Sequence, residues 1–267
     1  MTTSYLDRPD GRIAFDDTSG GGPLVVLLPG MGDRRATYRY LTPLLTGAGY
    51  RVVTMDLRGM GESTTGWPDY SRAAVGSDLV ALLNHLDAGP AVLVGNSYSA
   101  GGIVRAAAER PDRVAGIVPL DGFFRAMELG RLVRLGARVM ARFPRLWSMY
   151  YKSLFATAKP ADLTAYRAGL VTMLRDPARR AALREMFLLP DNHAERWVPD
   201  VRCPVLVVMG TKDPDFSDPA AEARLQAELL HGGDVAMIDG AGHYPYAEYP
   251  QRTFDALRPF LKETLGA

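Results

Sequence analysis

Ser97 stands in a setting that suits a catalytic nucleophile. The apolar run at 91–94 stops at Gly95, Ser97 follows two positions later, and small residues then open a predicted helix. A strand, a sharp turn with a serine at its tip and a helix form the layout of a nucleophile elbow, whose usual pattern is Gly-x-Ser-x-Gly. Ser99 replaces the last glycine of this pattern and is an alternative nucleophile, but the strand end at Gly95 puts the tip at Ser97. A phosphate-binding turn would share this composition, so Ser97 needs partners elsewhere in the chain.

The chain offers His243 as the base that a serine nucleophile requires. A serine hydroxyl is a poor nucleophile near neutral pH unless a base takes its proton and a third group orients that base. His243 lies in a glycine-rich loop just beyond the last predicted strand, and a loop at the carboxyl end of a strand can bring an imidazole to Ser97. His85 lies within a predicted helix, His231 lies at a helix end beside two glycines, and His193 lies in a helical insertion.

Asp213 is the predicted acid that orients the histidine. In hydrolases with a strand–turn–helix nucleophile, the acid lies between the serine and the histidine in the chain. Asp213 closely follows the predicted strand at 204–209 and directly precedes Pro214, which biases it toward an extended conformation. Asp215 and Asp121, the latter at the end of the preceding strand, are the alternatives.

Two backbone N–H groups are expected to bind the oxyanion of such a reaction. The residue after the nucleophile, Tyr98, supplies one donor, and the loop after the strand at 24–28 supplies the other, with Met31 as the expected residue. The glycines of that loop would also serve an ordinary tight turn. This chemistry requires no cofactor and no metal.

The elements that must position these residues alternate between strand and helix. Strands are predicted at residues 12–15, 24–28, 51–55, 91–94, 114–120, 204–209 and 234–238. Helices are predicted at residues 37–48, 70–86, from the elbow to about 110, 219–230 and 250–265. The alternation predicts an α/β fold with a mostly parallel central sheet and helices on both faces.

A helical insertion interrupts the alternation. Residues 1–121 and 201–267 are predicted to form the α/β core, and residues 122–200 a helical cap at the carboxyl edge of the sheet, where open α/β sheets bind ligands. The insertion holds 10 of the 24 aromatic residues, more than its share of the chain. Many of these must pack on the core, but the excess suggests an apolar pocket over Ser97. The expected pocket residues are Phe123, Phe124, Met127, Trp147 and Tyr244.

The insertion is also basic, with 14 Lys and Arg against 7 Asp and Glu. Its arginines recur at spacings of three to six residues, at Arg125, Arg131, Arg134, Arg138, Arg142 and Arg145. We favour a solvated helix face as their explanation; an anionic substrate or an acidic surface partner would use the same residues.

The composition of the chain argues against several classes of protein. The chain has 267 residues, 47% hydrophobic and 23% charged, with a formal net charge of +1, which gives no reason to expect a nucleic-acid partner. Its one cysteine, Cys203, excludes an internal disulfide framework. No apolar run suits a signal peptide or approaches the roughly 20 residues of a membrane span. We therefore expect a cytoplasmic protein with a small-molecule substrate and no membrane partner, and leave its oligomeric state open.

Taken together, the motifs resemble those of an α/β-hydrolase with a cap domain. The similar segments are LLPGMGDRRATYRYL (oxyanion loop), DLRGMGES, VGNSYSAGG (elbow), PVLVVMGTKDP (acid turn) and DGAGHYPYAEYP (histidine loop). They occur in the family's order, and they lie within residues 1–121 and 201–267. Pro29, where the family more often has histidine, and Ser99 depart from the pattern.

The resemblance implies a serine hydrolase, and we favour a carboxylesterase with Ser97, His243 and Asp213 as its triad. Within this fold, cofactor-free haloperoxidases share the triad, and carbon–carbon bond hydrolases have a similar Gly-Asn-Ser elbow. Another class is a hydrolase-like ligand receptor, because residues 97–100 resemble the elbow of some plant hormone receptors. A serine at the tip argues against the carboxylate nucleophile of haloalkane dehalogenases and epoxide hydrolases.

Overall fold

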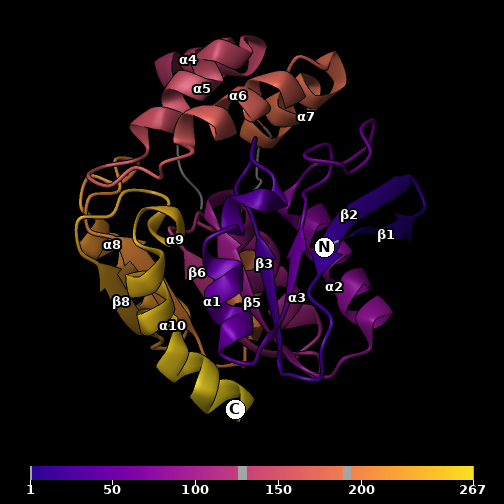
Figure 1. The fold of residues 1–267 in the computed structure, drawn as a ribbon, viewed down its shortest axis with the longest axis vertical. Coiled ribbons are helices and arrows are strands. Elements are labelled where there is room, and N and C mark those ends of the chain that lie inside the picture. The colour runs from indigo at the N-terminus through magenta and orange to yellow at the C-terminus, as the bar shows by residue number, and fades with distance from the viewer. Residues whose placement is uncertain (1, 126–130, 189–193, 267) are drawn as a thin grey trace.

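The computed structural model describes residues 2–125, 131–188 and 194–266, and within them one eight-stranded sheet runs through the molecule (Figure 1). The strands are β1 (Thr3–Arg8), β2 (Gly11–Asp17), β3 (Leu24–Leu28), β4 (Arg51–Met55), β5 (Ala91–Asn96), β6 (Val114–Leu120), β7 (Leu206–Gly210) and β8 (Asp234–Ile238). Their spatial order is β1-β2-β4-β3-β5-β6-β7-β8. Pairing is antiparallel for β1 with β2 and β2 with β4, and parallel elsewhere. The predicted α/β fold with a mostly parallel sheet is confirmed.

Helices cover both faces of the sheet. They are α1 (Leu41–Gly47), α2 (Arg72–Leu86), α3 (Ala100–Glu109), α8 (Pro219–Leu229), α9 (Pro245–Glu248) and α10 (Pro250–Leu265), with the 3-10 turns η1 (Arg35–Tyr38) and η2 (Ser97–Ser99). One buried apolar cluster joins the sheet to α2, α3 and α8, and a second joins it to α1 and α10.

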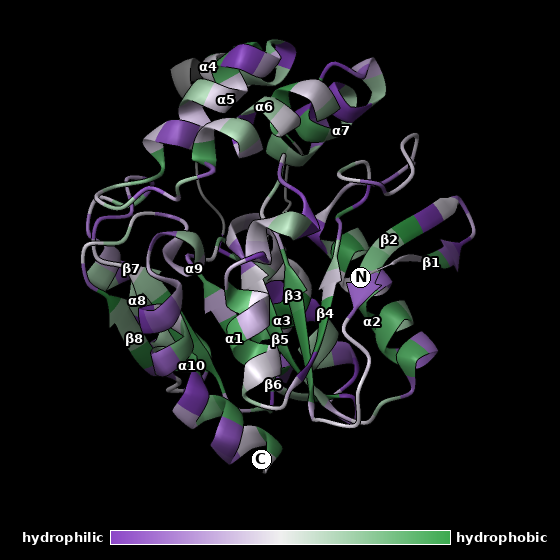
Figure 2. Ribbon diagram, viewed as in Figure 1, coloured by the Kyte–Doolittle hydropathy of each residue, from purple (hydrophilic) through white to green (hydrophobic). Residues whose placement is uncertain are grey.

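The strand sequences explain this two-sided core. Along β3, Leu24, Val26 and Leu28 face the first cluster, whereas Val25 and Leu27 face the second. Alternate side chains of a strand point to opposite faces, so a continuous apolar run is what burial on both sides requires. Figure 2 shows the central strands coloured as hydrophobic. The buried sheet holds the loops at its carboxyl edge in fixed positions.

The N-terminal third differs from the sequence prediction in two places. Strand β1 was not predicted; it pairs with β2 through a turn at residues 9–10, a Pro-Asp pair of the kind that favours turns. The helix predicted at 37–48 is divided into η1 and α1. Pro43 is the third residue of α1, in the first turn, where its missing N–H costs nothing; in the interior of a longer helix it would break a hydrogen bond.

Between β6 and β7 the described residues form helices and no strand. These are α4 (Arg131–Arg142), α5 (Pro144–Ser153), α6 (Leu163–Met173), α7 (Pro177–Leu188) and the 3-10 turn η3 (Glu195–Asp200). We call α4–α7 the cap; in Figure 1 these four helices lie together above the sheet. Within it, α4 packs on α7 and α5 packs on α6. None of the helices described in this structure has the length and apolarity needed to cross a bilayer.

Candidate active site

Ser97 lies at the turn between β5 and α3, in a backbone conformation that serine rarely adopts. Its φ is +54°, in the left-handed region, and its side chain is nearly buried. Such strain persists only where surrounding structure enforces it, and it is concentrated at functional sites. The turn is also tight, because a Cβ on Gly95 would lie 2.9 Å from the carbonyl oxygen of Ser99. The structure therefore has the geometry of the predicted elbow.

Ser99 has a structural part in this turn. Its hydroxyl lies 3.0 Å from the carbonyl oxygen of Leu28 and 2.9 Å from that of Asn96, so one O–H can donate to either acceptor. The first contact ties the elbow to the end of β3, the strand beside β5. A glycine at this position could not make that link, which gives the departure from the Gly-x-Ser-x-Gly pattern a physical explanation.

The loop at residues 29–33, which we call the Gly30 loop, lies against the elbow. A Cβ on Gly30 would be only 3.1 Å from the Cβ of Ser97 and 3.6 Å from its Oγ. Gly32 has a φ of +70°, and a Cβ there would be 2.3 Å from the ring of Trp147. Met31 is half-buried between these glycines, and Tyr98 is buried with its hydroxyl donating to the Tyr70 carbonyl at 2.8 Å.

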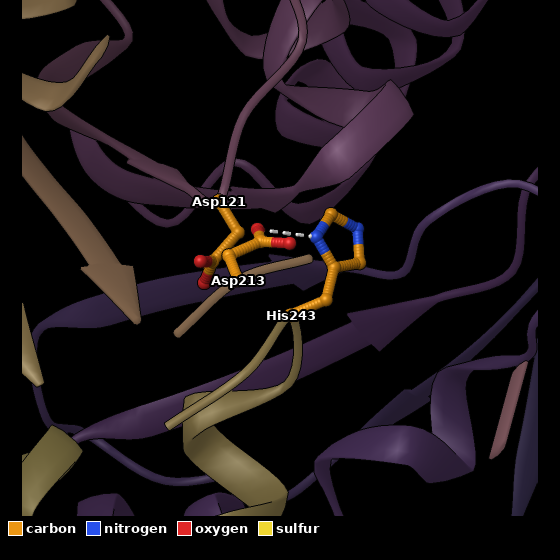
Figure 3. Close-up of side chains that lie close together, drawn as sticks. All are labelled: Asp121, Asp213 and His243. Carbon is orange, nitrogen blue, oxygen red and sulfur yellow. Dashed lines mark hydrogen bonds and ion pairs between the residues drawn. The ribbon is translucent and has the colours of Figure 1, made fainter. Parts of the chain in front are cut away.

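His243 and Asp213 form a buried pair. The Nδ1 atom of His243 lies 2.7 Å from Oδ2 of Asp213 (Figure 3). It lies 3.9 Å from Oδ2 of Asp215. Of the three candidate acids, Asp213 therefore makes the direct contact. Asp121 lies beside Asp213 and accepts a 2.9 Å hydrogen bond from the backbone N–H of Gly210.

Burial and neighbouring charges shift the pKa values of His243, Asp213 and Asp121. Burial alone would lower the pKa of His243, but the charge and hydrogen bond of Asp213, together with the charges of Asp215 and Glu248, outweigh burial and raise that pKa to about 9. Burial would raise the pKa of Asp213, yet the charge and hydrogen bond of His243, together with the hydrogen bond from the Asp215 N–H, hold it below its usual value. Asp121 is fully buried beside the charge of Asp213, and both effects hold its pKa well above the usual range. The neutral form of Asp121 is thereby favoured.

The same three side chains are the group that could hold a cation in the described part of the chain. Asp121, Asp213 and His243 place ligand atoms within 4.8 Å of one another. The 2.7 Å contact between His243 and Asp213 has the length of a charge-assisted hydrogen bond, the interaction that fixes an imidazole in one orientation. The expectation that no metal takes part stays a prediction.

Asn96 joins the elbow to the histidine, a contact that sequence reasoning missed. Its amide donates to the carbonyl of Leu120 at 3.1 Å and to that of His243 at 3.3 Å, and its Oδ1 accepts from the Tyr246 hydroxyl at 3.2 Å. Among the residues described, Ser97 Oγ makes no hydrogen bond to the His243 ring, and Asn96 links the two loops by hydrogen bonds instead. In the sequence, the only indication of this contact was the asparagine that directly precedes Ser97.

Glu248 anchors the loop that carries His243. Its carboxylate accepts from the backbone N–H of Gly242 at 2.7 Å and from that of Ala156 at 3.0 Å. The backbone N–H of His243 itself donates to the carbonyl of Leu154 at 2.9 Å. Burial raises the pKa of Glu248 to about 7, although these hydrogen bonds lower it. The histidine loop is thus fixed to the segment that follows α5.

The predicted pocket residues are found in different surroundings. Phe123 is half-buried, its N–H donates to the Ser97 carbonyl at 3.0 Å, and its ring lies 5.9 Å from that of His243. Tyr244 is buried with its ring 5.2 Å from His243. Trp147 donates from Nε1 to the Gly32 carbonyl at 3.2 Å.

Of the other two predicted pocket residues, the structure describes only Phe124. Phe124 is fully buried in the core cluster on the α2, α3 and α8 side of the sheet. Met127 lies outside the described residues.

The cap arginines lie mostly at the surface. Arg138, Arg142 and Arg145 are exposed, as the solvated-face explanation predicts, and Arg125 pairs with Glu222 at 2.7 Å. The side chains of Arg131 and Arg134 lie outside the described part of the structure. A hollow between α4 and α7 is lined by cap residues alone, among them Arg138, Arg142, Arg180 and Arg184.

Comparisons with known proteins agree with this architecture. A family model described as "Alpha/beta hydrolase family" matches residues 25–256. The chain is 31% identical to the polyketide synthase ThaQ of Burkholderia thailandensis, over all of the chain but only 13% of that synthase. It is 29% identical to the 2-(acetamidomethylene)succinate hydrolase of Mesorhizobium japonicum, over 94% of the chain and 92% of the hydrolase. The crystal structure of a bromoperoxidase from Bacillus anthracis superposes with a TM-score of 0.83 at 23% identity, covering 98% and 99% of the two chains.

Proposed function

The chain belongs to the alpha/beta hydrolase family, and we propose that it is a serine hydrolase that cleaves a small, mainly apolar carboxylic ester through an acyl-enzyme. The observation that carries the proposal is the meeting of three features at one edge of the sheet. These are the strained serine at the elbow, the Gly30 loop within contact of its side chain, and the buried His243–Asp213 pair that Asn96 ties to the elbow.

The first half of the reaction forms the acyl-enzyme. The Nε2 atom of His243 takes the proton of the Ser97 hydroxyl as Oγ attacks the ester carbonyl carbon. Asp213 accepts the hydrogen bond from Nδ1 and stabilises the imidazolium without taking its proton. The N–H groups of Met31 and Tyr98 hold the oxyanion. His243 then gives its proton to the departing alcohol, and the carbonyl re-forms on Ser97.

The second half releases the acid. A water molecule gives a proton to His243 and adds to the acyl carbon, and the oxyanion again lies against the N–H groups of Met31 and Tyr98. Collapse of this intermediate breaks the bond to Ser97 Oγ, which recovers its proton from His243. One ester and one water thus yield one alcohol and one carboxylic acid, and the enzyme returns to its starting state.

The surroundings of the elbow favour an apolar substrate. Phe123, Trp147 and Tyr244 lie around the Gly30 loop and His243, and their surfaces are aromatic rather than charged. Small-molecule sites have this character, with a few polar groups that fix orientation. The Mesorhizobium relative is a hydrolase, which also supports hydrolysis as the reaction class.

A panel of p-nitrophenyl esters of increasing acyl length tests the proposal. We expect turnover by the wild-type protein, with a preference for short to medium apolar acyl groups. The Ser97→Ala variant should lose turnover by about three orders of magnitude or more while keeping its circular dichroism spectrum. Ser77→Ala is the matched control, because Ser77 contacts Arg8 far along the chain from the elbow. Undiminished turnover by folded Ser97→Ala protein would end the proposal.

A further inference from the structure

Helix α5 contacts two separate loops of the candidate site. From one helix, Trp147 donates to the Gly32 carbonyl, Tyr150 donates to Asp215, and Tyr151 donates to Asp33 at 3.1 Å. Gly32 and Asp33 belong to the Gly30 loop, and Asp215 lies two residues beyond the acid that contacts His243. The position of α5 is therefore linked by hydrogen bonds to both sides of the site.

The Tyr150 contact is the one nearest to the histidine. Its hydroxyl lies 3.0 Å from each carboxylate oxygen of Asp215, so the O–H is centred on the carboxylate. Oδ2 of that carboxylate is 3.9 Å from His243 Nδ1. The backbone N–H of Asp215 also donates to Asp213 Oδ1 at 2.9 Å, which ties the two acids to each other.

We infer that Tyr150 is a positioning residue that holds the Asp215 carboxylate beside His243 Nδ1, so that the seating of α5 on the core sets the base strength of His243. Asp213 stays the direct partner of the imidazole, and Asp215 is a second negative charge at a longer distance. This inference rests on the proposed function only in taking His243 as the base, since the contacts themselves do not depend on it.

The Asp215 carboxylate acts on the pKa of His243 together with other buried acidic groups. The acidic groups that face the imidazole are Asp213, Asp215 and Glu248, with neutral Asp121 behind Asp213. All three charges raise the pKa of His243. The interaction is weakly screened because the ring is buried.

The hydrogen bond from the Tyr150 hydroxyl favours the charged form of Asp215. Burial raises the pKa of Asp215, and the charge of Asp213 adds to this effect, whereas His243 and the Tyr150 hydrogen bond lower it. Without the hydroxyl, the carboxylate becomes easier to protonate and free to turn away from Nδ1. Both changes remove negative charge from beside the imidazole, so the pKa of His243 should fall.

Two readouts test the inference on the full chain. The first is the pH titration of the His243 ring by nitrogen-15 NMR, which needs no substrate. The second is the acid limb of kcat/KM for a p-nitrophenyl ester. Tyr150→Phe and Asp215→Asn should each move both midpoints to lower pH by about one unit. The double variant should move them no further than Asp215→Asn alone, because the two residues act through one charge.

Tyr166→Phe is the matched control. It removes a cap tyrosine hydroxyl from a buried carboxylate, that of Asp33 at 2.6 Å, without touching a group that faces His243. It should leave both midpoints in place. Unchanged midpoints in Tyr150→Phe and Asp215→Asn, or an equal shift in Tyr166→Phe, would overturn the inference. A shifted NMR midpoint in a protein that hydrolyses no ester would instead overturn the proposed function and leave the inference standing.

Discussion

The two halves of the cap differ in what they touch. In α5 and α6, Trp147, Tyr151 and Tyr166 are buried and donate hydrogen bonds to the Gly30 loop. In α4, Leu135 and Val139 are exposed, and arginines line the hollow that α4 shares with α7. Helices α5 and α6 are part of the support of the candidate site, whereas α4 presents an apolar and basic surface to its surroundings and α7 buries its own apolar side chains in the core.

This difference shows why the composition of the cap could not identify its pocket. Phe143 and Trp147 are four residues apart, and both are aromatic residues in a basic helical segment. Phe143 is 51% exposed and Trp147 only 2%. Phe143 is the extended N-cap residue that precedes α5, whereas Trp147 lies within the helix. The partner of Trp147, Gly32, is more than a hundred residues away in the chain, so local composition could not separate the two aromatics.

The largest expected effect compares these two aromatics. Trp147→Ala should lower the free energy of unfolding by about 3 to 5 kcal/mol, because it empties a packed site and leaves the Gly32 carbonyl without its donor. Phe143→Ala should change it by less than about 0.5 kcal/mol. Urea unfolding of both variants measures the difference, and equal losses would show that the two halves of the cap are not distinct.

A second pair of variants compares carboxylates. Asp33 accepts hydrogen bonds from Tyr151, Tyr166 and the backbone of Arg34, so Asp33→Ala should cost about 2 kcal/mol or more by leaving buried donors unpaired. Asp176→Ala removes a half-exposed carboxylate that lies 3.7 Å from Arg179 and accepts from the Ala178 N–H at the start of α7, and should cost no more than about 1 kcal/mol. The same unfolding measurement checks both, and a larger loss for Asp176→Ala would reverse the comparison.

The pH dependence of turnover tests whether charges on the exposed α4 half of the cap affect the candidate site. The base must be neutral, and the pKa of His243 is raised to about 9, so kcat/KM should rise with pH to a midpoint near that value. Well below the midpoint it should fall about tenfold per pH unit. Arg142→Gln, on the exposed α4 half, should leave the midpoint unchanged, because solvent screens an exposed charge. A midpoint that moved with Arg142→Gln would link the outer surface to the site.

The smallest effect belongs to the arginines of the hollow. Arg138→Gln should change the free energy of unfolding by no more than about 0.5 kcal/mol, because Arg138 is exposed and has no carboxylate partner among the described residues. Thermal unfolding measures it. A loss of several kcal/mol would mean that α4 is held by charges rather than by its packing on α7.

Most of the predictions from the sequence rested on local patterns, such as apolar strands and the loops that follow them. The elbow at Ser97, the acid at Asp213 and the loop at His243 each follow a strand of the parallel part of the sheet. Parallel strands end at one edge of a sheet, so their meeting could be predicted. The choice of Asp213 over Asp215 depended on the proline that follows it, and Asp213 makes the shorter contact with His243.

What the sequence could not predict are contacts between distant segments. Asn96 bonds to His243, Tyr150 bonds to Asp215, and Tyr166 bonds to Asp33, and none of these pairs shares a local motif. Each depends on how the cap and the loops pack in three dimensions. The role of Ser99 was hidden for the same reason, because its acceptor on β3 lies far back in the chain.

The central claim, that Ser97 is a nucleophile activated by His243, is tested most directly with a serine-reactive fluorophosphonate and peptide mapping by mass spectrometry. The account predicts a single adduct on Ser97 in the wild-type protein, and a rate of labelling that falls by about a hundredfold or more in His243→Ala. Ser97→Ala should give no adduct. Labelling at another serine, or labelling of Ser97 that does not depend on His243, would contradict the account.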